Sequence, residues 1–234
     1  MNREVLRTSN FARDAAAFIL QQARRALGER GEFRIALSGG NTPRPVYQEL
    51  AQIGNELPWE RTFVTFSDER CVPPDDEQSN YRMARESLLT PASVPELSIA
   101  RLRGEIEPAV AAQEYEEQLD VLAAQKGEMI YRHDLILLGL GDDGHTASLF
   151  PGTAALEEHA RRVVANFVPK LDTWRLTFTL PLINQARQIC FLVNGAKQRE
   201  LIERVLAGDQ ELPAARVAPA NGDLTWIIGE AAGS

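Results

Sequence analysis

The chain has 234 residues, of which 44% are hydrophobic and 25% are charged, a composition typical of a globular protein that can bury a full α/β core. Its formal net charge of −8 argues against nucleic acid or an anionic membrane as the main partner. The amino terminus has no apolar signal core, no apolar run approaches membrane length, and Cys71 and Cys190 give no metal or disulfide framework, so we expect a cytoplasmic protein.

Apolar spacing predicts helices and strands that alternate along the chain. Ser9 or Asn10 can cap a first helix that runs to about Leu27, and Gly28 and Gly31 are expected to end it. The elements predicted next, in chain order, are a strand at Phe33–Leu37, a helix carrying Val46, Tyr47 and Leu50, a strand at Thr62–Phe66, a helix YRMARESLL capped by Ser79, a helix at Glu107–Lys126, strands at Leu135–Leu138, Leu176–Leu180 and Ile189–Val193, a helix at about Ala196–Leu206, and a strand at Leu224–Ile228. This alternation predicts an α/β fold with a doubly wound, mostly parallel sheet.

The segment DLILLGLGDDGHTASLFP joins a buried strand to a loop with two carboxylates and an imidazole. Leu135–Leu138 is wholly apolar, as a central parallel strand should be. Asp142, Asp143 and His145 follow directly, and Pro151 limits any helix after them. Open α/β sheets bind ligands at the carboxyl ends of their strands, so we predict that this loop is functional.

The same loop contains the pattern G-x-G-x-x-G at Gly139, Gly141 and Gly144, which taken alone is a weak signal for a dinucleotide. Two aspartates inside the pattern would repel a pyrophosphate, and Pro151 shortens the helix whose amino end should bind it. No strand ending in Asp or Glu follows at the expected spacing. We therefore expect neither a nicotinamide nor a flavin cofactor.

Four polar clusters each follow a predicted strand. They are SGGNTP at 38–43, SDER at 67–70, GDDGH at 141–145 and NGAK at 194–197. Each cluster alone could be a turn or an exposed corner. Because the carboxyl ends of parallel strands meet at one edge of a sheet, the four together predict a single site.

The first cluster has the features of a phosphate-binding turn. Gly39 and Gly40 allow backbone N–H groups to close on a ligand, Thr42 supplies a hydroxyl, and the positive end of a helix follows. No Gly-Lys-Ser/Thr follows, so the turn is not a Walker loop. Lys197 at another strand end suits a phosphate dianion. Arg44, Arg70 and Arg175 are further candidates for neutralising the anion, with a surface ion pair as the alternative for each.

His145 is the histidine with a functional context. Imidazole is the usual general base near neutral pH, and Asp143 could orient the ring or stabilise its charged form. The alternative is a histidine that only caps or packs. A second alternative is a divalent metal held by carboxylates and this ring, although the residues lack a recognised ligand spacing, and we expect no metal. The residues concerned are Asp68, Glu69, Asp142, Asp143 and His145.

The motifs SGGNTP, DERCVPPDDEQSNYRMARESLL, LGLGDDGHTASLFPG, WRLTFTLPLIN and FLVNGAKQ, with the tail LTWII, resemble the bacterial members of the 6-phosphogluconolactonase family over nearly the whole chain. The resemblance implies a Rossmann-like fold shared with glucosamine-6-phosphate deaminase and ribose-5-phosphate isomerase. It also implies cofactor-free hydrolysis of 6-phospho-D-glucono-1,5-lactone to 6-phosphogluconate in the oxidative pentose phosphate pathway. By the resemblance, His145 is the base, with Asp143 and Arg70 as its helpers. The expected substrate-binding residues are Ser38, Gly39, Gly40, Thr42, Arg44, Asp68, Arg175 and Lys197.

The nearest alternative is the deaminase, which reads GHIAFNEP after its histidine. Here the sequence is HTASLFPG, with no carboxylate between His145 and Glu157, and SDER replaces an Asp-Glu-Tyr pattern. Both differences favour lactone hydrolysis over aldose-ketose isomerisation. A sugar-phosphate sensor without chemistry is the other alternative, which the presence of His145 and Arg70 disfavours.

No repeat, low-complexity tract or clear linker interrupts the sequence, so we expect residues 1–234 to form a single domain. The expected partner is a small-molecule sugar-phosphate lactone, with no nucleic acid and no membrane. We expect a monomer or a small homo-oligomer.

Overall fold

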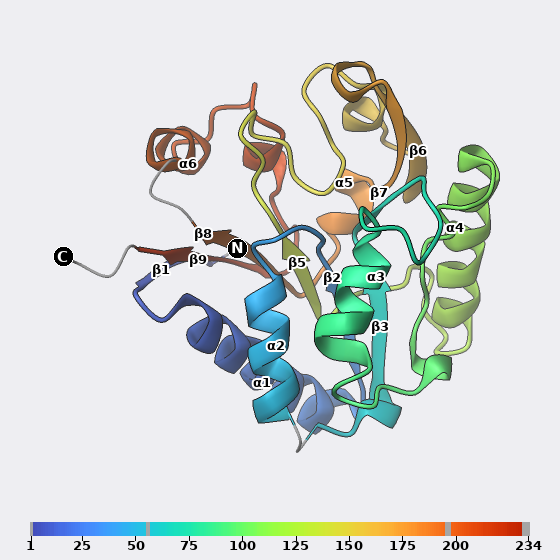
Figure 1. Ribbon diagram of the computed structural model, residues 1–234, viewed down its shortest axis with the longest axis vertical. Helices are drawn as coiled ribbons and strands as arrows, with labels where there is room; N and C mark the ends of the chain where they lie inside the picture. Colours follow the sequence, from blue (N-terminus) through green and yellow to red (C-terminus); the bar gives the residue numbers. More distant parts are fainter. Residues whose placement is uncertain (1, 55–56, 195–197, 231–234) are drawn as a thin grey trace.

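A computed structural model describes residues 2–54, 57–194 and 198–230 (Figure 1). Its main sheet has six strands in the order β1-β9-β8-β5-β2-β3, and every neighbouring pair is parallel. This arrangement confirms the predicted α/β fold with a mostly parallel sheet. The strands are β1 (Arg3–Thr8), β2 (Phe33–Leu37), β3 (Thr62–Phe66), β5 (Leu135–Leu138), β8 (Gln188–Asn194) and β9 (Asp223–Gly229).

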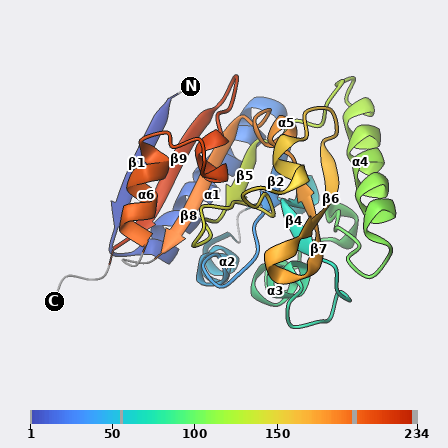
Figure 2. The same ribbon diagram turned by 90° about the horizontal axis from the view of Figure 1, so that it is seen from above.

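A second, antiparallel sheet of three strands was absent from the sequence prediction. It has the order β4-β7-β6, with β4 (Asp68–Arg70), β6 (Val163–Val168) and β7 (Thr173–Phe178). The strand predicted at Leu176–Leu180 therefore belongs to this sheet and ends at Phe178, because Leu180 already begins a short helix with a proline behind it. Seen from above, this sheet lies at the β3 end of the main sheet, away from β1 (Figure 2).

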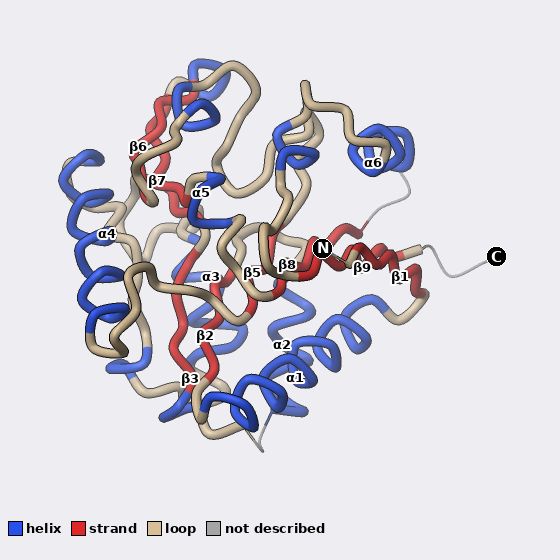
Figure 3. The backbone as a smooth tube through the Cα atoms, turned by 180° about the vertical axis from the view of Figure 1, so that it is seen from behind, coloured by secondary structure: helices blue, strands red, loops and turns tan. Residues whose placement is uncertain are grey.

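Helices cover both sheets. α1 and α2 lie together on one side of the main sheet and α6 on the other (Figure 1 and Figure 3), whereas α4 packs against β6 and β7. The described helices are α1 (Phe11–Arg30), α2 (Arg44–Ile53), α3 (Asn80–Ala84, continued by a π-helical turn Arg85–Leu89), α4 (Pro108–Ala124), α5 (Leu180–Ile183) and α6 (Arg199–Leu206). No helix in these described ranges is long and apolar enough to cross a membrane.

The helix ends correct one sequence prediction and confirm another. α1 continues through Gly28 and ends at Gly31, whose φ of 76° is the left-handed conformation that favours glycine at a helix end. Asn10 occupies the N-cap position of α1, but its side chain makes no capping hydrogen bond. Ser79 is the predicted cap of α3, since its Oγ accepts a hydrogen bond of 3.1 Å from the backbone N of Arg82.

The main sheet places the predicted polar clusters at its carboxyl edge. Residues 38–43 follow β2, Ser67 alone separates β3 from β4, and residues 139–150 follow β5. These three clusters lie close together, as the parallel topology predicts. The fourth begins at Asn194, the last residue of β8, but residues 195–197 lie outside the described part of the chain.

A buried histidine lies at the opposite, amino end of β5. His133 is 0% exposed, and its Nε2 lies 2.9 Å from Thr65 Oγ1. The Thr65 hydroxyl donates to the carbonyl oxygen of Ile35, so the imidazole Nε2 must carry the hydrogen in this contact. Burial, together with the nearby Arg34 cation, lowers the pKa of His133 to about 3.

His133 should make the fold sensitive to acid. Its folded-state pKa of about 3 lies below the ordinary value of 6.5, so the unfolded chain binds the proton more readily and stability falls as the pH drops from 6.5 toward 3. We expect the free energy of unfolding, measured by urea denaturation, to fall less between pH 7 and pH 4 in His133→Gln than in the unsubstituted protein. The exposed His159→Gln is the control. Equal losses in all three proteins would contradict the prediction.

Candidate active site

A histidine and a carboxylate form the centre of the site. The Nδ1 atom of His145 lies 2.6 Å from Asp143 Oδ1, and the other carboxylate oxygen, Oδ2, accepts a hydrogen bond of 3.0 Å from Lys170 Nζ. The imidazole stacks on the ring of Phe150, with the ring centroids 4.0 Å apart. Partial burial acts to raise the pKa of Asp143, but the bonds from His145 and Lys170 outweigh it and bring the pKa to about 2. Asp143 is therefore ionised at neutral pH.

The loop after β5 holds this pair by its backbone. The N–H of Gly141 donates to the carbonyl oxygen of His145, and the N–H of Gly144 donates to that of Gly141, both at 2.9 Å. Gly144 has a φ of 80°. The imidazole lies directly over Gly141, where an added Cβ would be 2.0 Å from the ring carbon Cε1. These two glycines thus have a local explanation that involves no dinucleotide.

The turn after β2 forms the neighbouring wall. Tyr47 Oη donates to the carbonyl oxygen of Ser38 at 2.9 Å and accepts from its N–H at 3.0 Å, which fixes the start of the turn. Gly40 has a φ of 91°, and a Cβ at Gly39 would lie 1.8 Å from Asn80 Oδ1. Among the described residues, Ser38 Oγ and Asn80 Oδ1 are buried without a hydrogen-bond partner. Polar atoms of this kind await a partner, and a bound ligand can supply one.

Two arginines lie opposite each other on adjacent strands of the second sheet. Arg70 in β4 and Arg175 in β7 are paired in the strand register. Arg70 Nη1 donates to the carbonyl oxygen of Gln78 at 2.7 Å, whereas Arg175 makes no hydrogen bond or ion pair with any described residue. Burial and the adjacent Arg70 cation both lower the pKa of Arg175. Two neighbouring guanidinium groups with so few acceptors favour an anion between them.

The acidic residues before Arg70 have structural partners. Ser148 Oγ donates to Asp68 Oδ2 at 2.7 Å, and Asn80 Nδ2 donates to Asp68 Oδ1 at 3.3 Å. The Glu69 carboxylate accepts from three backbone N–H groups and from Ser79 Oγ, which ties β4 to the start of α3. Across residues 2–54, 57–194 and 198–230, no group of three His, Cys, Asp or Glu side chains is arranged to hold a metal ion.

These walls enclose two adjoining hollows. The glycine-turn hollow, of about 200 Å³, lies between residues 38–43 and 139–147. The hairpin hollow, of about 270 Å³, lies between the loop after β5 and the β6–β7 hairpin. His145, Arg70, Asp68 and Ala147 line both, so the imidazole lies where the two hollows meet.

Most predicted site residues line these hollows. Arg44 begins α2 but lines neither hollow, so its role as an anion contact stays a prediction. Lys197 lies outside the described residues. The predicted residues that line a hollow are Ser38, Gly39, Gly40, Thr42, Asp68, Arg70, Asp143, His145 and Arg175.

Sequence reasoning missed three contacts of the site. Asn80 against Gly39, Phe150 under the imidazole and Ser148 on Asp68 depend on packing between elements, and nothing in their spacing indicates them. A fourth contact, that of Lys170 with Asp143, exists only because the β6–β7 hairpin brings this lysine to the loop after β5.

Fold and site together define an α/β enzyme with a glycine turn beside a histidine–carboxylate pair, at the carboxyl edge of a parallel sheet. Residues 7–226 match the family described as glucosamine-6-phosphate isomerases/6-phosphogluconolactonase. The chain belongs to this family, and the resemblance seen in its motifs is thereby confirmed.

Several relatives carry the name 6-phosphogluconolactonase. The protein from Synechocystis sp. is 43% identical over 213 residues, which cover 89% of this chain and 87% of that protein. The human protein is 36% identical over 224 residues, which cover 93% of this chain and 86% of that protein. The crystal structure of the protein from Thermotoga maritima has a TM-score of 0.87 at 26% identity, covering 98% of this chain and 100% of the other. These relatives confirm the predicted enzyme class and fold.

Proposed function

We propose that this protein hydrolyses 6-phospho-D-glucono-1,5-lactone to 6-phosphogluconate. The observation that carries the proposal is the His145–Asp143 pair at the junction of two hollows, with a glycine turn on one side and two arginines on the other. A base beside an anion site is what a phosphorylated ester substrate requires. The names of the relatives support the same reaction.

The hydrogen bond between the ring and Asp143 selects the useful tautomer. Because Asp143 is ionised, Nδ1 of His145 donates its hydrogen to the carboxylate. A neutral imidazole with hydrogen on Nδ1 has its lone pair on Nε2. Nε2 can therefore accept a proton, and Asp143 stabilises the imidazolium that results.

In the proposed step, Nε2 of His145 takes a proton from water while the water oxygen forms a bond to the lactone carbonyl carbon. Arg70, or N–H groups of the nearby backbone, stabilises the oxyanion. The bond from this carbon to the ring oxygen then breaks, and His145 returns the proton to the departing oxygen. The products are the free carboxylic acid and the hydroxyl that belonged to the ring, so the balance needs water alone.

The glycine turn and the arginines divide the binding of substrate between them. We assign the phosphate to the backbone N–H groups of Gly39 and Gly40 and to the Ser38 hydroxyl, with Lys197 as a further candidate cation. Arg70 and Arg175 then attract the anionic substrate and the charge that develops during reaction. This reaction places the protein in the oxidative pentose phosphate pathway.

The test is the acceleration of lactone hydrolysis over its spontaneous rate. Glucose-6-phosphate dehydrogenase generates the lactone in place, and a chelator is present throughout. We expect a large acceleration that the chelator leaves unchanged. No acceleration, together with activity on glucosamine 6-phosphate, would instead support the deaminase alternative. Two negative results would favour the sugar-phosphate sensor.

Replacing Arg175 should weaken substrate binding. We expect Arg175→Gln to raise KM by on the order of tenfold, because hydrogen bonds to charged groups contribute about 1.5–3 kcal/mol. Arg175 has no hydrogen-bond partner among the described residues, so its loss leaves none of their acceptors unpaired and the thermal unfolding midpoint should change little. Arg44→Gln, outside both hollows, is the matched comparison and should have a smaller effect on KM. A KM for Arg175→Gln equal to that of the unsubstituted enzyme would contradict the assignment.

A further inference from the structure

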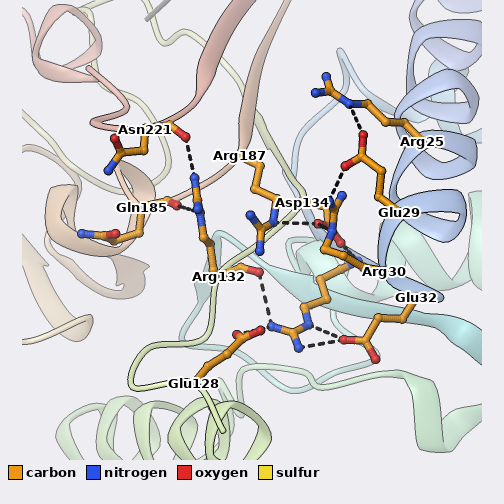
Figure 4. Close-up of polar contacts among 11 residues, drawn as sticks. Arg25, Glu29, Arg30, Glu32, Glu128, Arg132, Asp134, Gln185, Arg187 and Asn221 are labelled. Carbon is orange, nitrogen blue, oxygen red and sulfur yellow. Dashed lines mark hydrogen bonds and ion pairs between the residues drawn. The ribbon is translucent and has the colours of Figure 1, made fainter. Parts of the chain in front are cut away.

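A third hollow lies at the amino edge of the main sheet, opposite the candidate active site. We call it the amino-end pocket; at about 430 Å³ it is larger than either hollow at the carboxyl edge. Asp134 just before β5, Gln188 at the start of β8 and Asp223 at the start of β9 all line it. Its other walls come from the end of α1 and from the turn before β9 (Figure 4).

Arg187 lines this pocket with its hydrogen bonds unused. Its Nε lies 3.2 Å from Asp134 Oδ1, close enough for an ion pair, but the guanidinium makes no hydrogen bond with the described residues, and Nε is buried. Asp134 is already occupied, because Oδ1 accepts from Arg30 Nε and Oδ2 from the backbone N of Arg34, both at 2.9 Å. Arg187 therefore has donors that Asp134 does not satisfy.

Arg132 lies beside Arg187 and has no carboxylate partner among the described residues (Figure 4). Its Nε and Nη2 donate to the carbonyl oxygens of Gln185 and Asn221. These neutral acceptors fix the guanidinium without neutralising it. Burial lowers the pKa of Arg132, and the neighbouring cations Arg187 and Arg30 lower it further. The two guanidinium groups thus repel each other, and Asp134, which is shared with Arg30, offsets this repulsion only in part.

The acidic residues of the pocket already have hydrogen-bond or ion-pair partners, some of them arginines of the same pocket. Glu29 forms ion pairs with Arg25 and Arg30. Asp223 accepts a hydrogen bond from the backbone N of Asn2 through Oδ1. The lining contains four arginines and three acids, so positive charge predominates locally on a protein whose net charge is −8. The four arginines are Arg25, Arg30, Arg132 and Arg187.

We propose that the amino-end pocket is a second anion-binding site, which takes a small phosphate dianion, either inorganic phosphate or a phosphate monoester, between Arg132 and Arg187. Planar guanidinium forks match the oxygen geometry of phosphate. The anion reduces the repulsion between the two cations. Its oxygens accept hydrogen bonds from the Arg187 N–H groups that no described residue accepts. This site lies at the amino edge of the main sheet, whereas His145 lies at the carboxyl edge. The proposal does not depend on the proposed reaction.

The experiment is a ligand titration of isotope-labelled protein, monitored through its amide NMR spectra. Sodium phosphate and glycerol 3-phosphate are added separately, with sodium chloride holding the ionic strength constant. We expect the amides of Asn221 and Gly222 to shift and saturate with at least one of the two ligands. The ligand with the lower Kd identifies the source of the phosphate group. In Arg187→Gln that Kd should rise by about tenfold or more, and Arg187→Lys should restore part of the affinity.

The active site also binds phosphate under the proposed function, so the variants must separate the two sites. Arg70→Gln should weaken the shifts at Gly39 and Gly40, because Arg70 lines the same hollow, and should leave those at Asn221 unchanged. Shifts confined to Gly39 and Gly40 in the unsubstituted protein would overturn the proposal. Equal affinity at Asn221 in Arg187→Gln and in the unsubstituted protein would overturn it as well. Failure of lactone hydrolysis would affect neither result.

Discussion

Replacing His145 with alanine should lower kcat by on the order of 10²–10⁴, the usual contribution of a positioned general base. KM should change far less, because the groups assigned to substrate binding lie on other segments, among them the turn after β2 and strands β4 and β7. The imidazole is partly exposed at the junction of two hollows, so its loss opens space that water can fill and the fold should persist. Steady-state kinetics on the lactone, corrected for spontaneous hydrolysis, measure the effect.

The control for this substitution is His159→Ala. His159 is an exposed histidine 14 positions further along the chain, and it lines neither hollow. The His159→Ala substitution also removes one imidazole from the protein, but it leaves the residues of the candidate active site unchanged. We expect its kcat to match that of the unsubstituted enzyme. If His145→Ala retained full kcat at saturating substrate, the imidazole could not be the base, and a carboxylate or a metal-bound water would have to replace it.

Strands of the central sheet were the most predictable elements. β2, β3 and β5 have the bounds predicted from the sequence, because each is a short, mostly apolar segment whose residues are nearly all buried. β1 escaped prediction because five of its six residues are exposed and its sequence, REVLRT, has no continuous apolar run. An edge strand of this kind is specified by its neighbour, here β9, and not by its own pattern.

The antiparallel sheet, like β1, could not be predicted from local sequence, although it contributes residues to the site. β4 is only three residues long, and its pairing with β7 joins positions more than 100 residues apart. That pairing places Arg70 opposite Arg175, a contact that local pattern cannot reveal. In contrast, Asp143 and His145 are two residues apart, and the sequence predicted their contact because a short glycine-containing loop leaves little choice of geometry.

Two histidines in opposite environments have different expected roles. His133 is expected to lower the stability of the fold in acid, and His145 is the proposed general base of the site. His133 is sealed among apolar rings and has one hydrogen-bonded nitrogen, so protonation is costly there. His145 has an ionised carboxylate at one nitrogen and open space at its edge. The sequence analysis singled out His145 alone, because it follows an apolar strand at the sheet edge where ligands bind.

Substituting Gly141 with alanine should disable catalysis while leaving every functional group in the chain. A Cβ at this position would lie 2.0 Å from Cε1 and 2.1 Å from Nδ1 of His145, far inside contact distance. The obstructing atoms are the end of a side chain, so the ring can rotate away and the backbone need not move. The displaced ring loses its bond to Asp143, and with it the tautomer that leaves Nε2 free. Misplacement of a reacting group by about 1 Å can cost about 10²-fold in rate.

Gly139→Ala is the matched control for displacement of the ring, because a Cβ there meets no atom within 4 Å. Since Gly139 lines the glycine-turn hollow, the two variants are compared in kcat at saturating substrate and not in KM. We expect Gly141→Ala to lower kcat by on the order of 10²-fold, with the thermal unfolding midpoint nearly unchanged, and Gly139→Ala to retain both. The pair of variants also separates two explanations of the glycine pattern. If the glycines served a dinucleotide, both substitutions should disturb the protein alike; if Gly141 is required by the imidazole above it, only one should. Full activity in Gly141→Ala would mean that the ring reacts from another position, and the tautomer argument for Nε2 would fail.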